Sequence, residues 1–245
     1  MAGPGGQLAI DPEGNIYGTS ERQYGSVFQV TPEDTLNVLY HFPRDVHRRK
    51  SRQQPRGGVS LDALGNVFGT VSHSGSMSRG AIFKITTTDV ESTVYSFTGG
   101  PSGRLPESPL VLDGAGNIYG TAAGQSDNDG IAYMVTPSET ETILHSFGGC
   151  CNDGLTSGVL RLSSNGKLLG TTPLGGEYGG GTLYVISQRG FAVVHNFGGK
   201  TYQGVADGKF PSGGVIDLQG KIYGVTAAGG TYGKGALYEF VRRSG

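Results

Sequence analysis

Histidine, aspartate and arginine side chains gather in one segment that has no counterpart elsewhere in the chain. The segment Pro43–Arg56 reads PRDVHRRKSRQQPR and holds His47 and Asp45 among six basic residues. Guanidinium groups match the oxygens of carboxylate, sulfate and phosphate, so Arg48 and Arg49 predict an anion clamp for an acidic glycan or a phosphoester. A solvated basic loop is the simpler interpretation of the same run of charge.

A metal site is a second kind of chemistry that the sequence suggests. His47 and Asp45, with His73 of the next repeat, offer nitrogen and oxygen ligands for zinc, and an open coordination position would activate water. No paired-ligand spacing such as HxH or CxxC supports this site. Separately, the run DNDG places Asp127 and Asp129 where they suit calcium, although an Asx-rich turn also explains it. A divalent metal, zinc or calcium, is the one cofactor suggested.

Carboxylates and tyrosines in other connections suggest glycan chemistry. Glu107 with Glu177, or with Asp129, would supply the two carboxylates of a glycosidase, but nothing in the sequence selects a pair. Tyrosine rings in three equivalent connections could stack on sugars. These are Tyr24, Tyr178 and Tyr232. The sequence contains no GxSxG elbow, so a serine hydrolase is disfavoured.

Two further histidines are interpreted as framework residues. His145 and His195 occupy the position that tyrosine holds in other copies of a repeat, as at Tyr95. The dipeptides Asp153-Gly154 and Asp207-Gly208 recur in successive copies and are interpreted as one structural turn element.

The repeat itself is five-fold and sets the architecture. Its markers are GNIYGT (14–19), GNVFGT (65–70), GNIYGT (116–121), GKLLGT (166–171) and GKIYGV (220–225). Their first glycines lie 51, 51, 50 and 54 residues apart, and a constant period of this size is typical of a solenoid, an array or a propeller.

Each copy predicts four short strands and no helix. A short apolar run is followed by the marker, by a strand such as SVFQV (26–30) and by a strand such as NVLYHF (37–42). This pattern predicts an all-β, five-bladed β-propeller in one domain, 1–245, with a β-solenoid as the structural alternative. The expected repeats are 6–42, 57–97, 108–147, 157–197 and 213–243. The last blade is expected to lack its outer, fourth strand.

The recurring FGG turns and glycine-rich hairpins resemble the tandem repeat of secreted bacterial proteins called GloVer-repeat proteins. The motif is visible in Phe97-Thr98-Gly99-Gly100, in Phe147-Gly148-Gly149 and in GGEYGGGTLY (175–184). The first repeat departs most, since Pro43–Arg56 replaces its FGG turn. The resemblance implies an extracellular or cell-surface propeller and brings no catalytic residues with it.

Composition excludes several classes of protein. A net charge of −1 over 245 residues provides no general attraction for nucleic acid, and no apolar stretch is long enough to insert into a membrane. The only cysteines, Cys150 and Cys151, are adjacent, so a disulfide between them cannot close a long loop. The sequence does not decide whether they form a vicinal disulfide. We expect a monomer.

Three functions remain open at this point. The first is a secreted propeller that binds a glycan or an anionic small molecule through the long connections on one face. The second is a metal-dependent hydrolase of phosphoesters, glycosides or lactones on the same face, with His47, His73, Asp45, Glu107 and Glu177 as candidate catalytic groups. The third is a structural surface module.

Overall fold

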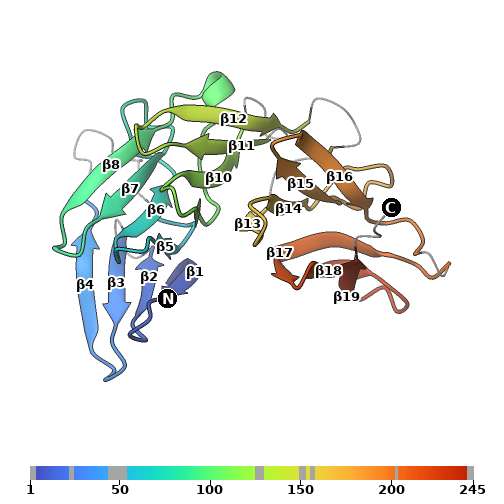
Figure 1. Ribbon diagram of the computed structural model, residues 1–245, viewed down its shortest axis with the longest axis horizontal. Coiled ribbons are helices and arrows are strands. Elements are labelled where there is room, and N and C mark those ends of the chain that lie inside the picture. Colours follow the sequence, from blue (N-terminus) through green and yellow to red (C-terminus); the bar gives the residue numbers. More distant parts are fainter. Residues whose placement is uncertain are drawn as a thin grey trace. The chain divides into compact units, whose positions relative to one another are not determined.

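The chain folds into five antiparallel β-sheets, as a computed structural model shows (Figure 1). The structure describes residues 4–21, 25–43, 54–124, 130–148, 153–154, 158–201 and 204–241. Within these ranges, one 3₁₀ turn (Gly100–Ser102) is the only helical element, and no helix is long and apolar enough to cross a membrane. The all-β prediction is confirmed.

Each sheet follows the order of the chain. The first contains β1 (Pro4–Ile10), β2 (Ile16–Ser20), β3 (Ser26–Val30) and β4 (Leu36–His41). The second contains β5 (Val59–Leu61), β6 (Val67–Val71), β7 (Ala81–Ile85) and β8 (Glu91–Ser96). The third contains β9 (Val111–Leu112), β10 (Ile118–Ala123), β11 (Gly130–Val135) and β12 (Glu141–Ser146).

The last two sheets differ in strand number. The fourth contains β13 (Arg161–Leu162), β14 (Leu168–Thr172), β15 (Thr182–Ser187) and β16 (Gly190–Asn196). The fifth contains β17 (Gly208–Leu218), β18 (Lys221–Gly229) and β19 (Ala236–Val241). Among the described residues the fifth sheet therefore has three strands and ends at β19.

The chain divides into two compact units, each described by itself. One comprises residues 1–125 and 134–142, and the other residues 126–133 and 143–245. The division passes through the third sheet. The expected single domain and its repeat boundaries stay a prediction.

The marker sequence folds because two of its residues make fixed contacts. In the first three copies an asparagine caps the preceding hairpin, whereas the fourth and fifth copies have lysine at that position. In the second sheet, the side chain and backbone of Asn66 donate to the carboxylate of Asp62 at 2.7 and 2.9 Å. Its second glycine lies under an aromatic ring of the third strand, since a Cβ on Gly69 would come within 2.5 Å of Phe83. Only glycine leaves room for that ring.

Substituting Gly69→Ala should therefore destabilise the protein. Phe83 is fully buried and has no space to move, so we expect the free energy of unfolding to fall by about 1–3 kcal/mol in a denaturant titration. Gly114→Ala is the matched control, because a Cβ there meets nothing within 4 Å and the second repeat carries Ala63 at the same turn position. Equal losses in the two variants would contradict this account.

Candidate functional site

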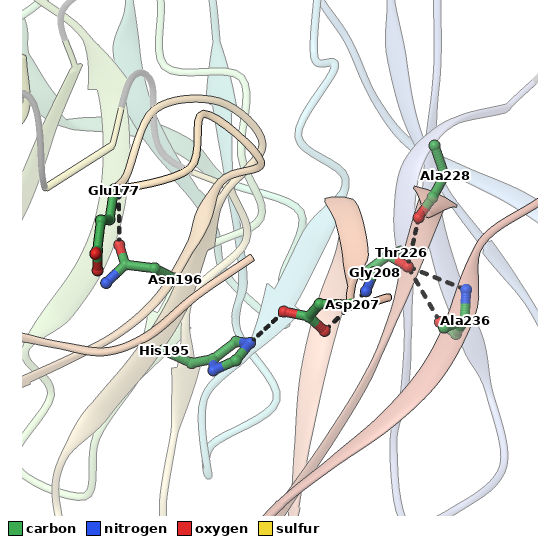
Figure 2. Close-up of polar contacts among 8 residues, drawn as sticks. All are labelled: Glu177, His195, Asn196, Asp207, Gly208, Thr226, Ala228 and Ala236. Carbon is green, nitrogen blue, oxygen red and sulfur yellow. Dashed lines mark hydrogen bonds and ion pairs between the residues drawn. The ribbon is translucent and has the colours of Figure 1, made fainter. Parts of the chain in front are cut away.

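Two histidine–aspartate pairs lie in successive copies of the repeat. In the fourth copy, His195 Nε2 is 2.8 Å from Asp207 Oδ2, while Asp207 Oδ1 accepts a hydrogen bond of 2.7 Å from the backbone N–H of Gly208 (Figure 2). In the third copy, His145 Nε2 is 3.2 Å from Asp153 Oδ2. Both aspartates are buried and both histidines are partly exposed. Each carboxylate thus fixes the orientation of one imidazole.

A β-bulge determines where His195 points. Leu183 pairs with His195 and Tyr184 with Val193, so Val194 is an extra residue in β16. The same shift occurs between the third and fourth strands of the first and second sheets. Residues an even number of positions apart share one face of a regular strand. When a bulge lies between them, the extra residue turns them to opposite faces of the sheet.

The glycine after each aspartate packs closely against a threonine. A Cβ on Gly208 would collide with Thr226 of β18, and a Cβ on Gly154 would collide with Thr172 of β14. Thr226 is itself fixed, since its hydroxyl accepts from Ala236 N at 3.0 Å and donates to Ala228 O at 3.1 Å (Figure 2). The predicted common turn is not seen, since Gly208 begins β17 and Asp153 lies in a bend. Each aspartate instead supplies the partner of a histidine, which sequence reasoning missed.

The two pairs differ in what covers the imidazole. The His145 ring stacks on Phe191, with ring centroids 3.6 Å apart and planes within 3°. His195 has only an edge contact with Phe197, at 4.6 Å, and a looser one with Phe240, at 6.4 Å. In the fifth sheet, the strand that would carry the counterpart of Phe191 is absent from the described residues. His195 is therefore open on that side.

A cavity of about 630 Å³ lies beside the open pair. It is lined by β19, by the end of β16 and by the connections around them. Its polar and aromatic lining includes His195, Asp207, Tyr232, Tyr238, Glu239 and Phe240. The volume is in the usual range for sites that hold a small ligand. An imidazole oriented by a buried carboxylate can hydrogen-bond such a ligand or accept a proton from it.

The predicted acidic residues have other partners. Glu107 forms an exposed ion pair of 3.2 Å with Arg56, which also lies 4.0 Å from Glu21. Glu177 is exposed, and its backbone N–H donates to Asn196 Oδ1 at 3.0 Å (Figure 2). Glu107 and Glu177 belong to different compact units, so their pairing stays a prediction.

The remaining described candidates lie in the connections between second and third strands. His73 is exposed, with Nδ1 3.1 Å from Ser72 Oγ. The ring of Tyr178 lies over Gly199, where a Cβ would come within 2.8 Å, so part of its role is packing. Tyr232, its counterpart, is 87% exposed and lines the cavity. Of the candidate residues, Tyr232 is therefore the one that lines the same cavity as the His195–Asp207 pair.

Several candidates lie outside the described residues. They are Tyr24, Asp45, His47, Arg48, Arg49, Asp127 and Asp129, together with Cys150 and Cys151. Among the residues that are described, no three histidine, cysteine or acidic side chains group as a metal site. The predicted anion clamp and metal sites stay predictions.

The His145 pair predicts a pH dependence of stability. Burial lowers the pKa of His145, and the hydrogen bond and charge of Asp153 offset this only in part. The folded state then binds fewer protons than the unfolded state, so this histidine's contribution falls as pH drops through the unfolded value near 6.5. We expect His145→Gln to lose less unfolding free energy than wild type between pH 7.5 and pH 5. The same pH slope in both proteins would contradict this.

The fold is shared with solved structures of low sequence identity. A candidate gluconolactonase is 13% identical, with 97% of this chain and 77% of that chain covered at a TM-score of 0.57. A gluconolactonase from Xanthomonas campestris is 9% identical, with 95% and 70% covered at 0.53. A protein of unknown function from Bacteroides caccae is 12% identical, with 88% and 68% covered at 0.51. At such identities the likeness shows the fold alone.

Comparison with sequence families identifies the repeat. No curated protein matches the chain. The Gloeobacter/Verrucomicrobia repeat matches residues 3–238, which is nearly the whole chain and includes all five markers. The resemblance found in the FGG turns and glycine-rich hairpins is therefore confirmed, and the chain belongs to the Gloeobacter/Verrucomicrobia repeat family.

Proposed function

We propose that this chain is a binding module, built as a five-bladed β-propeller, that holds its ligand in the groove of the fifth sheet. The observation that carries this proposal is the cavity beside the open His195–Asp207 pair. The equivalent pair of the preceding copy is closed by Phe191, so the groove is a local feature and not a general property of the repeat. As its family resemblance implies, we place the module outside the cell.

A glycan is the small-molecule candidate for this groove. Tyr232 presents an almost fully exposed ring, and His195 and Asp207 offer polar groups at a fixed distance. An aromatic platform with a few oriented polar groups is the usual arrangement of a sugar site. The volume of about 630 Å³ is large enough for a short oligosaccharide.

Glycan binding would depend on the exposed tyrosine. In a glycan screen followed by calorimetry, Tyr232→Ala should weaken binding about five- to tenfold, because the stacking contact is worth about 1 kcal/mol. Met77→Ala is the matched control, since Met77 is an exposed residue in the equivalent turn of the second sheet. If no glycan binds the wild-type protein, this ligand class is wrong.

A hydrolase is the second candidate, favoured by the histidine–aspartate pair at the cavity. Asp207 orients His195, which could act as a general base toward water that attacks a lactone or ester. The predicted metal-dependent alternative would use His47, Asp45 and His73, of which the structure describes only His73.

The covered histidine, His145, provides a control for turnover by the His195–Asp207 pair. With lactone and ester substrates, His195→Gln should lower any turnover about 100-fold or more, the usual contribution of a general base. His145→Gln should leave it unchanged, because Phe191 covers that ring. Wild-type protein without turnover, or equal losses in both variants, would argue against the hydrolase.

A further inference from the structure

A serine lies beside a tyrosine and a glutamate at the junction of the second and third sheets. Ser102 ends the 3₁₀ turn that follows β8. Its hydroxyl donates a hydrogen bond of 2.7 Å to Glu141 Oε2 and lies 3.4 Å from the hydroxyl of Tyr95. All three residues belong to the compact unit that contains the first two sheets. They therefore share no residue with the groove of the fifth sheet.

The framework of the repeat does not account for this serine. In the first sheet, the counterpart of Tyr95 is Tyr40, and the counterpart of Glu141 is Glu91 of the second sheet. Burial, and then the charge and hydrogen bond of Glu91, raise the pKa of Tyr40. A tyrosine and a glutamate are thus enough to link neighbouring copies. Ser102 is an addition to this pair, and function in a repeated fold belongs to such local departures.

The turn fixes Ser102 and leaves it partly exposed. Gly100 and Gly103 have φ angles of 62° and 69°, which glycine adopts without strain. The N–H of Gly103 donates to Gly100 O at 3.1 Å, and the N–H of Gly99 donates to Gly103 O at 3.0 Å. Ser102 itself is only partly buried. A serine on a 3₁₀ turn does not match a GxSxG elbow, so the sequence pattern did not reveal it.

Glu141 has the properties of a general base. Burial raises the pKa of its carboxyl, and the hydrogen bonds of Ser102 and Tyr95 offset this only in part. Among the described residues, its Oε1 atom is buried and has no hydrogen-bond partner. A carboxylate with a raised pKa accepts a hydroxyl proton more readily than an exposed one, and 2.7 Å is within the reach of a general base.

We propose that Ser102 is a nucleophile toward small carboxylic esters, with Glu141 as its general base. Ser102 Oγ attacks the carbonyl carbon while its proton passes to Glu141 Oε2. The ester C–O bond breaks, and the alcohol leaves with that proton. Water, which gives its proton to Glu141, then hydrolyses the acyl-serine to the free acid and restores both side chains. The Tyr95 hydroxyl, beside Oγ, is a hydrogen-bond donor for the carbonyl oxygen.

A biotinylated fluorophosphonate tests the nucleophile directly. The reagent forms a stable P–O bond with a reactive serine while fluoride leaves. After incubation with the full chain, peptide mapping by mass spectrometry should find the label on Ser102. Ser138 is the matched control, because it is more exposed and its hydroxyl has a neutral partner, Thr136 Oγ1, at 2.8 Å. No label on Ser102, or equal labelling of Ser138, would overturn the proposal.

Glu141→Gln separates a general base from a structural hydrogen bond. The amide oxygen can still accept from Ser102, so the turn keeps its contact, but the amide cannot take the proton. We expect labelling of Ser102 to slow at least 100-fold. The melting temperature serves as the control for folding. A folded variant that is labelled as fast as the wild-type protein would contradict the role of Glu141.

The pH profile of labelling needs no variant protein. Because only the ionised carboxylate accepts a proton, the labelling rate of Ser102 should rise with pH through the pKa of Glu141. That midpoint should lie above 4.5, the ordinary value for glutamate, since burial raises it. A rate that does not change between pH 4 and pH 8 would contradict general-base catalysis by this residue.

Ester cleavage distinguishes this site from the groove of the fifth sheet. An ester of acetic acid with a good leaving group should leave an acetyl group on Ser102, detected in the same peptide map. Ester cleavage without acetylated or labelled Ser102 would come from another site and overturn the proposal. A glycan that binds while Ser102 stays unreactive would support the binding module and overturn the nucleophile. A reactive Ser102 without glycan binding would support the nucleophile alone.

Discussion

The bulge between the third and fourth strands is the constraint on which the site depends. A regular strand would turn Phe191 and His195 to the same face, since they are four residues apart. The extra residue Val194 sends Phe191 to the preceding copy and His195 to the following connection. One strand thereby fills two gaps between sheets.

The sequence predicted the sheets well because periodicity is a local signal repeated five times. The third strands match closely: SVFQV and AIFKI coincide with β3 and β7. A marker such as GNVFGT was recognisable because its asparagine and its second glycine each make a fixed contact in the folded sheet.

The site was harder to predict from the sequence, because its residues come from different parts of the repeat. Histidine and aspartate are eight residues apart in the third copy and twelve in the fourth, so no fixed spacing marks the pair. One signal was available: Asp-Gly occurs after the fourth strand in the two copies where histidine replaces tyrosine. The cover on His145 comes from the next copy and could not be recognised without knowing the bulge.

The replacement of tyrosine by histidine explains how the groove can stay open. In the second copy, the polar neighbour of Tyr95 is Glu141, on the fourth strand of the next sheet, through Ser102. In the fourth copy, the partner of His195 is Asp207, which lies in the connection and is held by Gly208 against Thr226. His195 thus takes its carboxylate from the connection that follows its own strand and needs no fourth strand in the next sheet. The pair is intact beside the three-stranded fifth sheet of the described residues, and it borders the cavity.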